Sequence, residues 1–213
     1  MEKILREILA EPEKHARWLN TLSLLEFLGS RKIARVLEKM GGEESVLRHL
    51  AEEARHALFF KGLIRRLTGG EPPDYSRENL LAPWAARRYF HGLDISAARF
   101  IKNRPSLFPD KERRTALCYV LVTALIEERA GEVYRLYDAL LQENGHSMSL
   151  RSLLKEEENH LSEMYRSLKL LLPREGEALL EELRGVEAKL FGRFQEKLAR
   201  EASIHPEAQP AFT

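Results

Sequence analysis

The chain of 213 residues is poor in cysteine and has no long apolar run. Its single cysteine, Cys118, excludes an internal disulfide, a cysteine-rich zinc site and a cysteine-ligated iron–sulfur cluster within one chain. The longest apolar segments, such as residues 117–126, fall well short of the roughly 20 residues that a membrane-spanning helix needs. Residues 1–4 carry an early acid and lack the apolar core of a signal peptide. These absences predict a soluble cytoplasmic protein with no membrane partner.

An excess of charge of one sign is also lacking. The chain has 34 Lys and Arg residues against 33 Asp and Glu residues, a net charge of +1, which removes the usual electrostatic case for a general nucleic-acid binder. A hydrophobic content of 44% beside 31% charged residues is typical of a folded chain. We expect one domain over residues 1–202 and a flexible C-terminal tail over residues 203–213.

Strand-forming patterns are scarce, and the hydrophobic periodicity is helical nearly everywhere. Proline and glycine divide the chain into segments that predict helices at about 12–40, 45–67, 79–103, 110–142, 149–172 and 176–202. Pro12 suits a first helical turn, Gly41-Gly42 a helix end, and Ser45 the cap of the helix that follows. Pro83 breaks the third of these segments.

Each half of the chain contains a long helix, a short polar break and another long helix. Helices of roughly 25–30 residues joined in this way are typical of an antiparallel four-helix bundle. The stretch 79–109 is too long for a tight turn and suits a long crossover that joins two helical hairpins. The expected fold class is therefore all-α: a four-helix bundle with a long crossover between helices 2 and 3, plus an additional C-terminal helix.

The second helix of each half carries one Glu-x-x-His motif. These motifs are Glu53/His56 and Glu157/His160. A spacing of three places the carboxylate and the imidazole on one helical face, where both can bind the same metal cluster. Both motifs fall on the apolar stripe of their helices, and burying unpaired charges costs several kcal/mol each. A pair of divalent cations would compensate that cost.

A single Glu-x-x-His match is weak, because this composition gives roughly one by chance. We interpret Glu143-x-x-His146 as that accident, since Asn144 and Gly145 lie between its members. The helices that pair with the two motif helices each offer one more acid in an apolar setting.

These two acids are Glu26 and Glu127. Glu127 is preferred to its neighbour Glu128 because its helical face carries small or apolar residues, whereas the face of Glu128 continues into Glu132 and Arg135.

The order Glu, Glu-x-x-His, Glu, Glu-x-x-His resembles the ferritin-like di-iron carboxylate superfamily, over about residues 18–172. The resemblance implies six metal ligands: Glu26, Glu53, His56, Glu127, Glu157 and His160. It further implies that Glu53 and Glu157 bridge the metals and that each histidine binds one of them. The implied cofactor is two iron ions, with manganese as an alternative that the ligand types do not exclude.

Other features are weaker. Tyr134, two turns after Glu127, is either a hydrogen-bonding neighbour of the metal site or, as we favour, an ordinary core tyrosine. His49, one turn before Glu53, is interpreted as a partly exposed helix residue rather than a partner of the site. The Arg87-Arg88 and Arg113-Arg114 pairs are compatible with an anion or RNA, but such pairs are usually solvated faces.

The resemblance implies an O2-activating oxidase or oxygenase whose substrate, small or macromolecular, is not identified. Electrons would come from a separate donor, because no flavin or nicotinamide motif is present. Two alternatives stay open: a non-enzymatic helical module that docks its C-terminal helix on a partner, and an iron-storage protein. The same helix suits a fifth core helix or a homodimer interface.

Overall fold

The computed structural model describes residues 1–39, 42–105 and 110–203. The described part of the chain is all-helical and contains no strand. Its elements are α1 (Glu2–Leu9), α2 (Pro12–Lys39), α3 (Glu44–Thr68), the short 3-10 helix η1 (Arg77–Asn79), α4 (Pro83–Lys102), α5 (Lys111–Glu143), α6 (Arg151–Leu171) and α7 (Gly176–Ser203). All six predicted helices are present with ends close to the expected ones. The predicted tail lies, apart from Ser203, outside the described residues.

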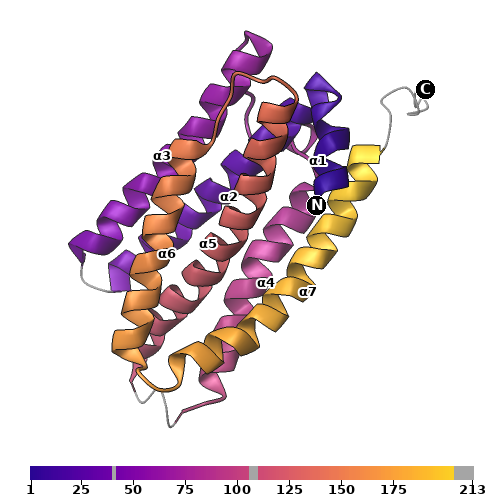
Figure 1. The fold of residues 1–213 in the computed structure, drawn as a ribbon. Coiled ribbons are helices and arrows are strands. Elements are labelled where there is room, and N and C mark those ends of the chain that lie inside the picture. The colour runs from indigo at the N-terminus through magenta and orange to yellow at the C-terminus, as the bar shows by residue number, and fades with distance from the viewer. Residues whose placement is uncertain (40–41, 106–109, 204–213) are drawn as a thin grey trace.

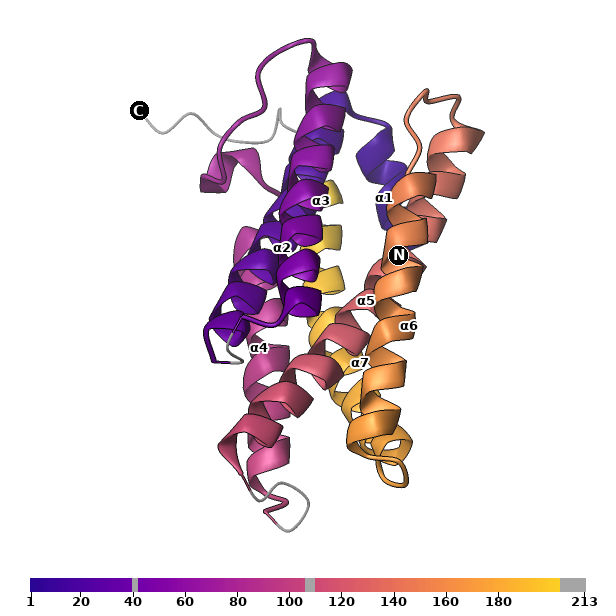
Figure 2. The ribbon, with the colours of Figure 1, turned by 90° about the vertical axis from the view of Figure 1, so that its left-hand side faces the viewer.

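The long helices run side by side along one axis of the molecule (Figure 1). α2 pairs with α3 and α5 pairs with α6, so that two helical hairpins face one another (Figure 2). The connection between them is more than a loop, because it contains the 20-residue helix α4. α4 packs along α7 and also contacts α2 and α5. No helix in the described part of the chain has both the length and the apolar composition needed to cross a membrane.

Two helix ends follow well-known local rules. The Asp110 side chain caps α5 by accepting a hydrogen bond from the Arg113 backbone N–H at 2.6 Å. Gly69 ends α3 in the left-handed region, with φ at +69°, which favours glycine. The prediction for Ser45 is wrong: α3 already begins at Glu44, and the Ser45 hydroxyl bonds instead to the Glu43 carboxylate at 2.8 Å. Of the predicted helix end at 41–42, Gly41 lies outside the described residues.

The short helix α1 was not predicted. It has only eight residues, but Leu5 and Ile8 on one of its faces are fully buried. That face packs against α2, α5 and α7. A helix this short is marginal by itself, so it is packing against the other helices that stabilises it.

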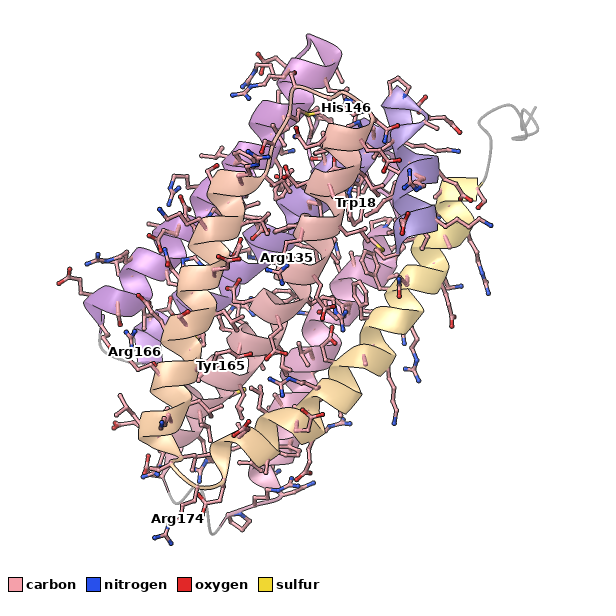
Figure 3. The ribbon with its side chains drawn as sticks, in the orientation of Figure 1. Trp18, Arg135, His146, Tyr165, Arg166 and Arg174 are labelled. Atoms are coloured by element: carbon pink, nitrogen blue, oxygen red, sulfur yellow. The ribbon has the colours of Figure 1, made fainter. Side chains whose placement is uncertain are left out.

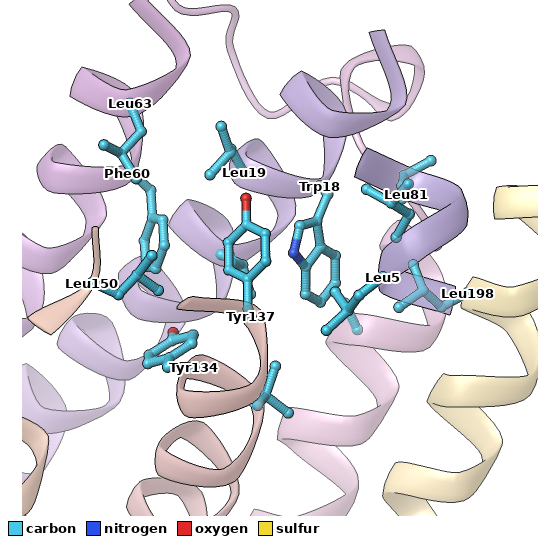
Figure 4. Packing of buried hydrophobic residues seen from close by; sticks show 14 of the residues in the cluster. Leu5, Trp18, Leu19, Phe60, Leu63, Leu81, Tyr134, Tyr137, Leu150 and Leu198 are labelled. Atoms are coloured by element: carbon cyan, nitrogen blue, oxygen red, sulfur yellow. The ribbon is translucent and has the colours of Figure 1, made fainter. Parts of the chain in front are cut away.

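The core consists of side chains from all the long helices. Trp18 of α2 and Tyr137 of α5 pack edge to face near the centre of one cluster (Figure 4), with ring centroids 6.4 Å apart. Charged side chains such as Arg166 and Arg174 instead project from the ribbon into solvent (Figure 3). The apolar face of α7 belongs to this core, because Leu183, which is fully buried, and Phe194, which is nearly so, lie inside the molecule. Much of the face that a docking partner would use is therefore covered by the chain itself.

Candidate metal centre

The six predicted ligands are all buried between the two hairpins, each with at most 7% of its surface exposed. One comes from α2, two from α3, one from α5 and two from α6: Glu26, Glu53, His56, Glu127, Glu157 and His160. The amphipathic phase of each helix places these side chains on its inward face. Four carboxylates and two imidazoles therefore share one region of the interior, where solvent does not screen them.

The interior holds two groups of buried side chains, and within each group the ligand atoms lie within 4.8 Å of one another. Five of the six predicted ligands belong to these groups, and Glu157 belongs to neither. One group comprises Glu26, Glu53 and His56; the other comprises His49, Glu53, Glu127 and His160. Glu53 belongs to both groups. Carboxylate oxygens and imidazole nitrogens are ligands that suit iron, manganese or zinc, so the buried cluster is able to hold a metal ion.

The outward-facing nitrogens of the two predicted histidine ligands are held by glutamates from opposite helices. His56 Nε2 on α3 lies 2.8 Å from Glu156 Oε2 on α6, and His160 Nε2 on α6 lies 2.8 Å from Glu52 Oε2 on α3. A carboxylate accepts hydrogen bonds, so each contact places the ring proton on Nε2. When the rings are neutral, the Nδ1 lone pairs of both therefore face the cluster.

Glu157 lies between these two Nδ1 atoms. Its Oε1 is 3.1 Å from His56 Nδ1, and its Oε2 is 3.5 Å from His160 Nδ1. Neither contact has hydrogen-bond geometry, so both Nδ1 atoms and both Glu157 oxygens are buried without a hydrogen bond. Buried polar atoms are rarely left in this state. Coordination of cations would satisfy all four of these atoms at once, and the residues present therefore fit a metal centre.

Two further residues position the carboxylates. Tyr134 is buried in the core, as we favoured, and its hydroxyl also donates a hydrogen bond to Glu26. Gly29, one turn after Glu26 on α2, leaves space for the Glu53 carboxylate: a Cβ atom there would lie only 2.8 Å from Glu53 Oε2. The cluster therefore requires glycine at this helix crossing in order to keep Glu53 where it is.

The interpretation of His49 as partly exposed is wrong. Only 4% of it is exposed, and its Nε2 lies 3.2 Å from Glu53 Oε1 and 3.5 Å from Glu127 Oε1. Its Nδ1 is 2.6 Å from the Tyr119 hydroxyl. The inward position of His49 could have been predicted from its spacing, because a residue four positions before Glu53 and seven before His56 shares their helical face.

The choice between Glu127 and Glu128 follows the predicted phase. Glu127 is 4% exposed inside the cluster. Glu128 lies at the surface, where it pairs with Arg184 at 2.7 Å and accepts a hydrogen bond from Tyr165 at 2.6 Å. Amphipathic phase therefore separated two adjacent, chemically identical residues.

The third Glu-x-x-His match takes no part in the cluster. Glu143 forms an exposed ion pair with Arg6 at 2.9 Å. The His146 ring packs against His15, with ring centroids 5.2 Å apart. The motif therefore belongs to the surface and to the far end of α5, as its composition indicated.

Protonation limits the charge of the cluster when no cation is bound. Burial, together with neighbouring carboxylates, raises the pKa of Glu26 and of Glu127 well above the usual value. For His56 and His160 burial favours the neutral ring, but the neighbouring carboxylates, Glu157 foremost, together outweigh it and raise the pKa of each to about 9. Metal ions must displace these protons, so metal affinity increases with pH.

A small cavity adjoins the carboxylates. Its volume is about 70 Å³, and Glu26, Glu53 and Glu127 form part of its wall. The rest is mostly apolar and includes Ile126 and Phe191. The carboxylates therefore border a small space whose walls are mostly apolar.

Known proteins provide no guide to this cluster: no family model, no curated protein and no solved structure matches the chain. The geometry itself carries the interpretation. Buried histidine and glutamate side chains from four helices form a cluster that is able to hold a metal ion.

Proposed function

We propose that the chain is a dimetal carboxylate protein of the ferritin-like type and that it activates O2 as an oxidase or oxygenase. In this proposal α2, α3, α5 and α6 are the four helices of the bundle, α4 lies within the crossover, and α7 is the additional helix. The observation that carries the proposal is the set of buried atoms without hydrogen bonds, the Nδ1 atoms of His56 and His160 and both oxygens of Glu157.

The two groups of ligand atoms support an assignment of one cation to each. Glu26 and His56 would bind the first, Glu127 and His160 the second. Glu53, which belongs to both groups, would be a ligand shared by the two cations. Glu157, which contacts both imidazoles, would be the second shared carboxylate.

His49 is an additional candidate ligand of the second cation. If its Nδ1 proton is donated to Tyr119, the Nε2 lone pair is free to bind a metal. In the other tautomer, Nε2–H donates to Glu53 and the ring positions that carboxylate instead. Both arrangements keep the remaining six ligands unchanged.

Iron ions at this site, or manganese in their place, would supply the binding and reduction of O2. The chain's own residues prepare the site for that chemistry. Glu156 and Glu52 fix the orientation of the imidazoles, and Tyr134 fixes that of Glu26. The apolar wall of the small cavity limits water beside the carboxylates. Electrons would come from a separate donor, and the substrate would be an organic molecule.

The test is O2 consumption by protein loaded anaerobically with Fe(II). Wild-type protein should consume O2 faster than the same concentration of free Fe(II), and Glu157→Ala should lose that excess. Glu158→Ala is the matched control, because Glu158 is the next residue on α6 but is mostly exposed and pairs only with Arg135. Its rate should stay within about twofold of wild type.

Two results would contradict the proposal. One is wild-type consumption no faster than that of free Fe(II). The other is a large hollow oligomer on size-exclusion chromatography that accumulates many iron ions per chain, because that behaviour defines iron storage rather than oxygenation.

A further inference from the structure

A second, larger pocket opens between α2, α4 and α5. Its volume is about 810 Å³, and eight of its lining residues are Lys or Arg, against a single carboxylate, Asp94. The whole chain has a net charge of only +1, so this is a local concentration of positive charge. Arg87 and Arg114, whose pairs we interpreted as solvated faces, both line it. None of the six predicted metal ligands is on its wall.

Several of the basic side chains of the pocket have no acidic partner among the described residues. Asp94 is paired with Lys32 at 2.9 Å. Arg35, Arg87 and Lys102 make no ion pair with any of the described residues. Like charges brought together in a concave site repel one another and attract an anion.

The shape and the remaining lining favour a small organic molecule. A volume of about 810 Å³ falls within the range of small-molecule sites, roughly 300–1,000 Å³, and exceeds what an inorganic anion fills. Leu28, Phe90 and Ile101 provide apolar wall for a carbon skeleton. Arginine side chains present paired N–H groups that match the oxygens of phosphate and carboxylate groups.

The pocket reaches the metal centre at two side chains. Tyr119 lies on its wall, and the Tyr119 hydroxyl is 2.6 Å from His49 Nδ1, whose ring contacts Glu53 at 3.2 Å. Phe90 lines both this pocket and the small apolar cavity beside the carboxylates. A molecule in the pocket would therefore lie one aromatic side chain away from that cavity.

We propose that this pocket binds a small organic anion, with phosphate or carboxylate groups on the arginines and an apolar part against Phe90. Binding itself requires no metal. The additional statement that this anion is the substrate class of the metal centre rests on the proposed dimetal function.

Binding is tested on the full chain without added metal, using two fluorescent probes that share one ring system. The anionic probe is 8-anilinonaphthalene-1-sulfonate, and the neutral control is N-phenyl-1-naphthylamine, which lacks the sulfonate. The anionic probe should bind about tenfold more tightly or better, because only it can pair with the guanidinium groups. Inorganic pyrophosphate and citrate should displace it, and the more effective of the two identifies whether phosphate or carboxylate is preferred.

The decisive variant is Arg31→Glu/Arg35→Glu, two exposed positions one turn apart on the pocket side of α2. The matched control is Arg193→Glu/Lys197→Glu, with the same charge change and spacing at exposed positions of α7 outside the pocket. Circular dichroism should show both variants folded. The pocket variant should lose about tenfold or more in affinity for the anionic probe, and the control should stay within about twofold.

Three outcomes would overturn the proposal: equal affinities for the two probes, equal losses in the two double variants, or displacement by a single-stranded oligonucleotide at a lower phosphate concentration than by pyrophosphate. The last would identify a nucleic-acid surface. Since none of these measurements uses iron or O2, their failure leaves the dimetal proposal standing, and failure of iron loading leaves this one standing.

Discussion

His56 Nε2 lies 2.8 Å from the carboxylate of Glu156, a residue exactly one hundred positions later in the chain. The same relationship recurs in reverse between His160 and Glu52. Each motif helix therefore supplies a histidine to the cluster and a glutamate that orients the histidine of the other helix. This exchange fixes both rings with Nδ1 directed at the carboxylates, which is the arrangement that metal-binding histidines commonly show.

Removal of Glu156 tests this exchange. In Glu156→Ala the His56 ring loses the partner that fixes its tautomer and orientation, so the affinity for Fe(II) should fall by about 10- to 100-fold. Anaerobic titration against a competing Fe(II) chelator measures it. Glu158→Ala should leave the affinity unchanged, because Glu158 is exposed and its carboxylate pairs with Arg135 at the surface. Equal affinities in all three proteins would show that the contact does not orient a ligand.

The alanine variants of Gly29 and Gly62 provide a second comparison between a test position and its control. Both are interior to helices, but a Cβ at position 29 would meet Glu53 Oε2 at 2.8 Å, whereas one at position 62 would meet nothing within 4 Å. Gly62→Ala should stabilise the protein by about 0.5–1 kcal/mol and keep its metal content. Gly29→Ala should fold as well, since only the end of a side chain must move, yet it should lose metal because the shared carboxylate is displaced.

Metal content by elemental analysis, together with chemical denaturation, compares these two variants. Retention of the full metal content in Gly29→Ala would mean that the position of Glu53 is unimportant for binding.

Tyr134 and Tyr165 each donate a hydrogen bond to a glutamate, one in the core and one at the surface. Tyr134→Phe leaves the buried Glu26 without that donor, so the free energy of unfolding of the metal-free protein should fall by about 1–3 kcal/mol. Tyr165→Phe removes a hydrogen bond to the half-buried, solvated Glu128 and should cost less than about 1 kcal/mol. Urea denaturation measures both, and equal losses would contradict the buried role of Tyr134.

Because His15 is buried, it should make the free energy of unfolding depend on pH, and this effect does not involve the predicted metal ligands. It is 1% exposed, and burial, with a smaller contribution from His146, lowers its pKa to about 4. Below pH 6.5 the unfolded chain binds a proton at this position that the native protein does not bind. Stability should therefore fall between pH 6.5 and 4, by roughly 3 kcal/mol from this group.

His15→Gln should show a loss of stability smaller by about that amount over the same range, because glutamine does not titrate. His91→Gln, at an exposed position, should follow the wild-type curve. Urea denaturation at a series of pH values gives the three curves. Superposition of the His15→Gln curve on that of wild type would contradict the assignment.

The helices and the inward position of six residues were predictable because both depend on periodicity along one helix. Glu127 and Glu128 illustrate this. Helical phase alone predicted that Glu127 faces the interior and that Glu128 does not. His49 also lay on the inward stripe, but without a motif partner its helical phase alone did not separate it from an ordinary helix residue.

Side-chain contacts between different helices could not be predicted from the periodicity of the sequence. The roles of Glu52 and Glu156 depend on which side chains of α3 and α6 meet, and both residues are partly exposed. The packing of α4 on α7 and the gathering of basic side chains from α2, α4 and α5 likewise exist only in the folded chain. The sequence alone therefore indicates no more than a solvated face at Arg87.

The most direct test of the central claim is the metal content of the protein after anaerobic reconstitution with Fe(II) and desalting. We expect about two iron ions per chain in the wild type, and less than one in Glu53→Ala, because Glu53 belongs to both groups of ligand atoms. A wild-type protein that retains essentially no metal, or a Glu53→Ala protein that retains as much as the wild type, would contradict the account.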